Sequence, residues 1–159
     1  MIIRTARPDD AEGICAIHNP IIAHTDITFT QNLREPASVA TQIAERGPAF
    51  LVAEAPHGVL GFATYGAFRD GPGYAATREH TIYLEETARG QGTGARLMSH
   101  LEESARSEGI HVLVAGLSHS NPAGIAFHRR IGFFETAKMP EVGRKFGRWL
   151  DLILMQKTL

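Results

Sequence analysis

Residues 88–98, ARGQGTGARLM, place three glycines within five positions, directly after an apolar segment and directly before a helical pattern. A glycine-rich turn between a strand and a helix brings backbone amides to the helix N-terminus, where the helix dipole favours an anion such as phosphate. Arg89 adds a positive charge beside the turn. The stretch therefore predicts an α/β chain with an anion-binding turn, although glycines that serve packing alone are an alternative.

Two familiar phosphate-binding motifs fit this turn poorly. Gly90, Gly92 and Ala95 match the dinucleotide fingerprint G-x-G-x-x-A, but three or four expected strands precede them, and the next strand ends without an acidic residue. A P-loop requires Lys-Ser or Lys-Thr after its last glycine, whereas this chain has Ala95-Arg96. The turn therefore matches neither motif well and is interpreted as a general anion-binding site.

The remainder of the chain alternates strand and helix patterns without a linker or an internal repeat. Helices are expected from Pro8, over 36–46, from the glycine turn to Gly109, and over 121–130. Strands are expected at 2–3, 50–54, 59–68, 79–84, 110–117, 133–138 and 149–157. With 159 residues the pattern predicts a single α/β domain, residues 1–159, around a mixed sheet.

Composition argues against several classes of partner. The net charge of -1 and a pI near 6.7 give no nucleic-acid or membrane footprint. No apolar run reaches the roughly 20 residues of a membrane span, and the first residues do not resemble a signal peptide. Cys15 is the single cysteine and is expected to be a buried small hydrophobe, which favours a cytoplasmic location. The eight histidines lack zinc-type spacing, so we expect no metal.

Arg89-x-x-Gly92-x-Gly94 resembles the pyrophosphate loop of the GCN5-related N-acetyltransferase (GNAT) superfamily. Further segments resemble its phosphinothricin and methionine sulfoximine (methionine sulfone) N-acetyltransferase subgroup: 25–29, 65–69, 79–84, 127–133 and 145–151 (KFGRWLD). The resemblance covers the whole chain. It implies a largely antiparallel sheet flanked by helices, splayed strands that hold acetyl-CoA, and a homodimer.

The resemblance also implies residues for the co-substrate. A bulged strand would pair its backbone with the pantetheine arm, and the amides of the turn would hold the pyrophosphate. Asn121 matches a cofactor-contacting asparagine, and a plain helix N-cap is the alternative. The implied acetyl-CoA residues are Ile82, Tyr83, Leu84, Arg89, Gly90, Gln91, Gly92, Thr93, Gly94, Ala95 and Asn121.

Attack of an amine on the acetyl thioester requires a base, because the amine is mostly ammonium at neutral pH. Glu79 aligns with the acidic residue of the family, although an exposed strand glutamate is equally compatible with the sequence; Glu85 and Glu86 are expected to face solvent. A backbone amide near Leu84 would stabilise the oxyanion. Many family members carry a tyrosine where this chain has His128, so either His128 or water would protonate the thiolate.

The acceptor pocket implied by the subgroup consists of Phe29, Phe68, Arg69, Glu79, His80 and Thr81. Arg69 could pair with a substrate carboxylate, or it could be a surface arginine. The KFGRWLD segment could shape the pocket or pack across a dimer, and Trp149 could instead lie in the core.

The resemblance therefore implies transfer of acetyl to the amino group of a small amino-acid-like substrate. A peptide or protein N-acetyltransferase and a non-catalytic acyl-CoA-binding module are the alternatives. A peptide substrate would need an open groove, whereas the loop at 68–74 and the KFGRWLD segment are expected to close the site.

Overall fold

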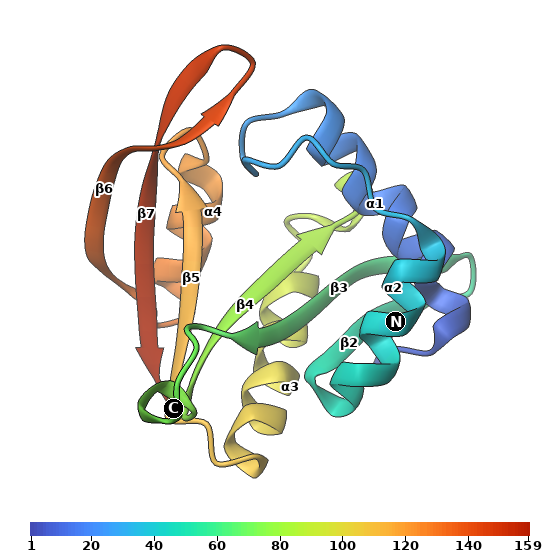
Figure 1. Ribbon diagram of the computed structural model, residues 1–159. Coiled ribbons are helices and arrows are strands. Elements are labelled where there is room, and N and C mark those ends of the chain that lie inside the picture. The colour runs from blue at the N-terminus through green and yellow to red at the C-terminus, as the bar shows by residue number, and fades with distance from the viewer.

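The computed structural model describes all 159 residues and contains one seven-stranded sheet with the order β1-β2-β3-β4-β5-β7-β6 (Figure 1). Neighbouring strands are antiparallel except β4 and β5, which are parallel. The strands are β1 (Ile2–Thr5), β2 (Phe50–Ala55), β3 (Gly58–Ala67), β4 (Thr77–Leu84), β5 (Val112–Ser118), β6 (Phe134–Lys145) and β7 (Arg148–Thr158). The predicted class, a mixed and largely antiparallel sheet flanked by helices, is confirmed.

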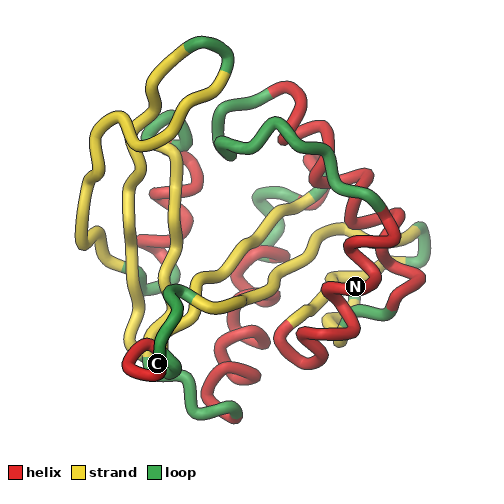
Figure 2. The backbone as a smooth tube through the Cα atoms, in the orientation of Figure 1, coloured by secondary structure: helices red, strands yellow, loops and turns green.

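Four helices cover the sheet (Figures 1 and 2). They are α1 (Ala11–His24), α2 (Pro36–Arg46), α3 (Thr93–Ser107) and α4 (Pro122–Arg130). Pro8–Asp10 forms a short 3-10 turn directly before α1, so the helix expected from Pro8 begins three residues later. Gly109, with φ of 75°, follows the end of α3 as the glycine signal predicts.

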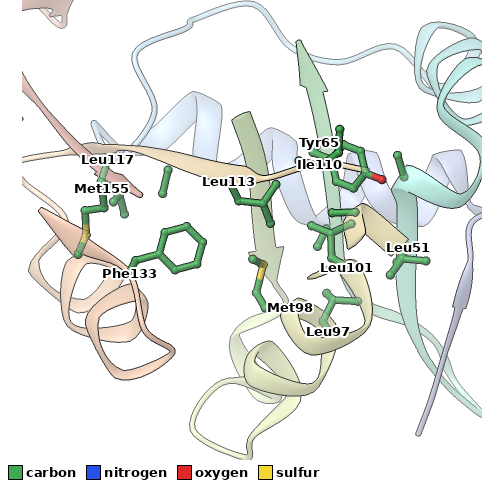
Figure 3. Close-up of a cluster of buried hydrophobic side chains, with 14 of the residues drawn as sticks. Leu51, Tyr65, Leu97, Met98, Leu101, Ile110, Leu113, Leu117, Phe133 and Met155 are labelled. Carbon is green, nitrogen blue, oxygen red and sulfur yellow. The ribbon is translucent and has the colours of Figure 1, made fainter. Parts of the chain in front are cut away.

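Alternation along the strands produces two apolar cores, one on each face of the sheet. Phe62 packs with Ile14 of α1 and Ile43 of α2. The next residue, Ala63, belongs to the core that contains Leu101 of α3. Figure 3 shows part of this second core, in which Leu97, Met98 and Leu101 lie near side chains of the sheet. The helices α1 and α2 therefore cover one face, and α3 covers the other.

The parallel pair β4–β5 is joined over only half of β4. The pairing runs from Thr77–Val112 to His80–Ala115, whereas β4 continues beside β3 as far as Leu84. The expected splay of the strands is therefore confirmed. The expected bulge is not found, because β4 pairs with β3 without a register shift. Since β5 follows β7 while the end of β4 follows β3, the two halves of the sheet diverge and leave an opening.

The last hairpin is longer than the sequence pattern predicts. We expected its first strand to end at Lys138, but β6 continues to Lys145. Pro140 and Glu141, whose φ is 57°, lie at a register shift between Met139 and Gly143, so the strand passes through a bulge instead of ending. This extension carries the hairpin tip toward the loop that follows α1 (Figure 1).

Candidate active site

A cavity of about 380 Å³ opens where β4 separates from β5. Residues 79–84 of β4 form one wall, and residues 116–118 of β5 lie opposite. One side of α4, from Ala123 to His128, lines one part of the cavity, and residues 27–29, which follow α1, line another. The cavity therefore lies within the opening of the splayed sheet.

The two faces of β4 present different chemistry to this cavity. Glu79, Thr81 and Tyr83 are paired with Gly66, Thr64 and Phe62 of β3, and directly opposite residues of antiparallel strands point to the same face. Because Phe62 packs under α1 and α2, this trio faces those helices. The alternate residues His80, Ile82 and Leu84 face α3 and α4. The cavity thus connects both faces of the sheet.

Glu79 lies where an acceptor could meet an acyl donor. A β-carbon built at Gly116 of β5 would lie 2.9 Å from Glu79 Oε1, so only a glycine there leaves the carboxylate its present place. Glu79 is an exposed strand residue that lines the cavity, yet the protein atoms around its carboxylate raise its pKa above the usual glutamate value. A carboxylate with a raised pKa is a stronger base at neutral pH.

The glycine turn gives α3 an uncapped N-terminus. Gly92 adopts a left-handed conformation with φ of 80° immediately before Thr93, and no side chain caps the helix. The first amides of a helix have no partner within the helix. A β-carbon at Gly90 or Gly92 would meet nothing within 4 Å, so the backbone is open to a ligand. These features fit the pyrophosphate of acetyl-CoA.

The positions implied for acetyl-CoA fall into two groups. Six of them line the cavity: Ile82, Tyr83, Leu84, Arg89, Gly94 and Asn121. The other five lie in the glycine turn and the first turn of α3 and do not line it: Gly90, Gln91, Gly92, Thr93 and Ala95. The backbone edge of β4 that faces β5 has no strand partner beyond His80, so it can receive an extended ligand. Asn121 caps α4, accepting a hydrogen bond from the Gly124 amide at 2.9 Å, and its side-chain NH₂ group makes no hydrogen bond within the chain.

His128 packs in the interior with a neutral ring. Its Nδ1 lies 2.7 Å from the Gly124 carbonyl, and this partner assigns the proton to Nδ1. His80 lies beside it, with ring centroids 5.0 Å apart, and both side chains are buried. Burial lowers the pKa of His128 and lowers that of His80 to about 3. His128 at neutral pH therefore lacks the charge of a ready proton donor.

The structure places four of the six implied acceptor residues at the cavity. Phe29, Glu79, His80 and Thr81 line the cavity, whereas Phe68 and Arg69 do not. Arg69 is exposed and lies over the Phe68 ring at 5.7 Å. Phe68 in turn packs edge-on against Tyr74, so the 68–74 loop folds on itself and does not contribute to the cavity wall. The loop expected to close the site therefore does not line the cavity in this structure.

Several cavity residues escaped the sequence analysis. They are Ile21, Ile27, Thr28, Gly116, Leu117, Ser118, Ala123, Gly124, Phe127 and Leu152. The segments 25–29 and 127–133, which contain Ile27, Thr28 and Phe127, resemble the subgroup, although no role was given to these three residues. The β5 and β7 residues carried no signal, because only the sheet register brings them beside β4.

Three smaller expectations can be compared with the structure. Trp149 has 58% of its surface exposed and stacks against Arg144 at 4.3 Å, so its placement in the core is wrong. Cys15 is buried, as expected. Glu85 and Glu86 do not line the cavity, and Glu86 is exposed.

No group of three or more histidine, cysteine, aspartate or glutamate side chains is arranged to hold a metal ion. None of the helices combines the length and the apolar character that crossing a membrane would require.

A splayed parallel pair of strands beside an uncapped helix N-terminus is an arrangement that can receive an extended ligand bearing a phosphate group. The chain belongs to the acetyltransferase (GNAT) family, whose model matches residues 20–133. An L-methionine sulfoximine/L-methionine sulfone acetyltransferase of Pseudomonas aeruginosa is 39% identical over 99% of this chain and 94% of that protein.

Two solved structures have nearly the same fold. One is a ribosomal-protein-alanine N-acetyltransferase of Brucella melitensis, with a TM-score of 0.94 and 38% identity over the whole of both chains. The other is a phosphinothricin acetyltransferase of Sinorhizobium meliloti in complex with acetyl-CoA, with a TM-score of 0.91 and 31% identity over 99% of this chain and 88% of that one. The chain is therefore an acetyl-CoA-dependent N-acetyltransferase.

Proposed function

We propose that this enzyme acetylates the amino group of small amino-acid-like acceptors such as methionine sulfoximine, methionine sulfone and phosphinothricin. The observation that carries the proposal is the position of Glu79 in a small cavity between the splayed strands, where its pKa is raised. Relatives named for these three acceptors support the choice of substrate. We assign residues 1–159 to one catalytic domain.

Glu79 acts as the general base in this proposal. The ammonium of the acceptor pairs with the Glu79 carboxylate and then gives it one proton, which frees the nitrogen lone pair for attack. The nitrogen attacks the thioester carbon of acetyl-CoA to give an oxyanion, whose collapse breaks the carbon–sulfur bond, and the nitrogen gives its second proton to water. The backbone amide near Leu84 stabilises the oxyanion, and water protonates the departing thiolate, because His128 is neutral.

Peptide or protein acetylation is the second candidate. It is favoured by the structure named as a ribosomal-protein-alanine N-acetyltransferase, which matches the whole of this chain. The absence of the 68–74 loop from the cavity wall also leaves more room for a larger acceptor than the sequence predicts.

Release of the CoA thiol distinguishes these candidates. Purified protein is given acetyl-CoA with phosphinothricin, methionine sulfoximine, methionine sulfone, ordinary amino acids, or peptides bearing an N-terminal alanine or an internal lysine. Turnover confined to the first three acceptors supports the proposal, and turnover of the peptides alone overturns it. No turnover with any acceptor, combined with retained acetyl-CoA binding, would favour a non-catalytic acyl-CoA-binding module.

We also propose that the enzyme is a cytoplasmic homodimer. Its β6–β7 hairpin exposes five large apolar side chains: Phe134, Met139, Val142, Phe146 and Trp149. Such a surface favours contact with a second copy. The free thiol of Cys15 fits a reducing compartment. Sedimentation measures the oligomeric state, and a monomer at micromolar concentration would contradict the proposed dimer.

A further inference from the structure

Lys145, the last residue of β6, is a lysine in an unusual place. Only 1% of its surface is exposed, although lysine is among the residues least often buried. Its Nζ donates hydrogen bonds to two carbonyl oxygens, that of Ile22 at 2.7 Å and that of Thr28 at 2.9 Å. The first belongs to the end of α1 and the second to the loop that follows. Lys145 therefore joins the hairpin tip to a segment more than a hundred residues away in sequence.

The chemistry of this contact explains why an ammonium is kept there. Ile22 lies in the last turn of α1, whose carbonyls lack partners within the helix and carry the negative end of its dipole. Burial lowers the pKa of Lys145, and the nearby Asp26 opposes that shift. The ammonium gives the helix end and the loop a shared donor that neither backbone segment can supply.

Two further contacts hold the same segment against the hairpin. Arg148, the first residue of β7, forms an ion pair with Asp26. The ring of Phe29 lies directly on Gly143 of β6, where a β-carbon would overlap the ring. Together these contacts fix residues 26–29 from both ends.

The fixed segment forms part of the cavity wall. Ile27, Thr28 and Phe29 all line the cavity on the face of the sheet that also presents Glu79. The positions implied for acetyl-CoA are different residues: 82–84 of β4, the glycine turn with the start of α3, and Asn121 before α4. A movement of residues 26–29 would thus alter the acceptor side of the cavity and spare the acyl-CoA side.

We propose that Lys145 is a positioning residue that holds residues 26–29 in place and thereby sets the acceptor-binding wall of the active site. It touches neither substrate, and it acts through the carbonyls of Ile22 and Thr28. The inference rests on the proposed function in one respect, which is that this wall receives the acceptor.

The test compares Lys145→Met with Lys138→Met, a matched control on the same strand whose side chain is 56% exposed. Initial rates are measured with the concentrations of methionine sulfone and acetyl-CoA varied separately. Lys145→Met is expected to raise the acceptor KM about tenfold, since two carbonyls lose a charged donor, and to leave the acetyl-CoA KM unchanged. Lys138→Met should behave as the wild type.

Equal increases in both KM values, or no increase in either, would overturn the proposal. If Lys145→Met does not fold, Gly143→Ala decides, because the added methyl displaces Phe29 without removing the ammonium. It is expected to raise the acceptor KM alone, and an unchanged acceptor KM would refute the role of this wall.

Amide hydrogen exchange separates this inference from the proposed function. The Thr25 and Arg34 amides have partners on α1, so the peptide 22–34 reports how firmly the segment is held. Faster exchange in this peptide alone, in Lys145→Met and not in Lys138→Met, supports the positioning role of Lys145 even if no acceptor in the panel reacts. Unchanged exchange in a folded variant overturns it.

Discussion

The contact between Gly116 and Glu79 gives the sharpest test of the active-site geometry. An alanine at position 116 would place its β-carbon 2.9 Å from Glu79 Oε1 and 3.6 Å from Leu152 Cδ1. The second distance is an ordinary van der Waals contact, whereas the first requires the carboxylate to move. Because the φ of Gly116 is not positive, the backbone accepts alanine.

The size of the effect follows from the distance. Ordinary van der Waals contact with a β-carbon begins at about 3.4 Å, so the carboxylate oxygen must retreat by about 0.5 Å. Displacement of a reacting group by about 1 Å can cost a hundredfold in rate, so half of that predicts a loss of about tenfold in kcat/KM, or about 1.4 kcal/mol. Replacing glycine by alanine inside a strand should also stabilise the fold by about 0.5 kcal/mol.

CoA-thiol release from acetyl-CoA and methionine sulfone measures kcat/KM, and chemical unfolding measures stability. Gly73→Ala is the matched control, since a β-carbon there would meet nothing within 4 Å. We expect Gly116→Ala to lose about tenfold in kcat/KM while it binds acetyl-CoA normally. A folded Gly116→Ala enzyme with wild-type kcat/KM would refute the claim that the Glu79 carboxylate must occupy its present position.

Two further predictions concern His18 and Asn121. His18, packed 4.5 Å from the Tyr83 ring, has its pKa lowered to about 4 by burial, so below pH 6.5 the unfolded chain binds more protons than the folded one. This histidine should cost the fold about 2 kcal/mol between pH 7 and pH 5 in urea unfolding; an equal loss in His18→Phe would contradict the assignment. Asn121→Ala should lose about 1 kcal/mol of stability with the helix cap and raise the acetyl-CoA KM. Asn121→Ser keeps a capping oxygen, so it should raise that KM alone, and wild-type KM values in both variants would exclude Asn121 from the acetyl-CoA site.

Local sequence signals predicted most of the elements of the fold. The glycine turn, the prolines at helix starts and the apolar run from Ile110 each depend on nearby residues, and the elements they predict are present, with α1 beginning at Ala11 and β5 at Val112. The end of β6 was missed for a physical reason. Pro140 and Glu141 are residues that disfavour a continuous strand, and β6 continues past them only because it pairs with β7 on both sides of a bulge.

The active site was predictable where it follows one segment and not where it joins several. The β4 positions from Glu79 to Leu84 line the cavity together because they are consecutive. Gly116 depends on the register between β4 and β5, which no local pattern encodes. Lys145 belongs to the KFGRWLD segment, whose role the sequence leaves open, and its burial arises from contact with the end of α1. Conversely, Phe68 and Arg69 lie at the end of a predicted strand, yet the structure places them in the 68–74 loop, outside the cavity wall.

The role of Glu79 is tested most directly by the pH dependence of kcat/KM in Glu79→Gln beside the wild type, with acetyl-CoA and methionine sulfone. In the wild type, activity should fall as pH decreases through the raised pKa of Glu79, above the usual glutamate value of 4.5, because the protonated carboxyl cannot accept a proton. Glu79→Gln should bind acetyl-CoA normally, lose a hundredfold or more in kcat/KM, on the order of a general base's contribution, and lack this acid limb. A Glu79→Gln enzyme that keeps most of its activity and an unchanged pH profile would contradict general-base catalysis by Glu79.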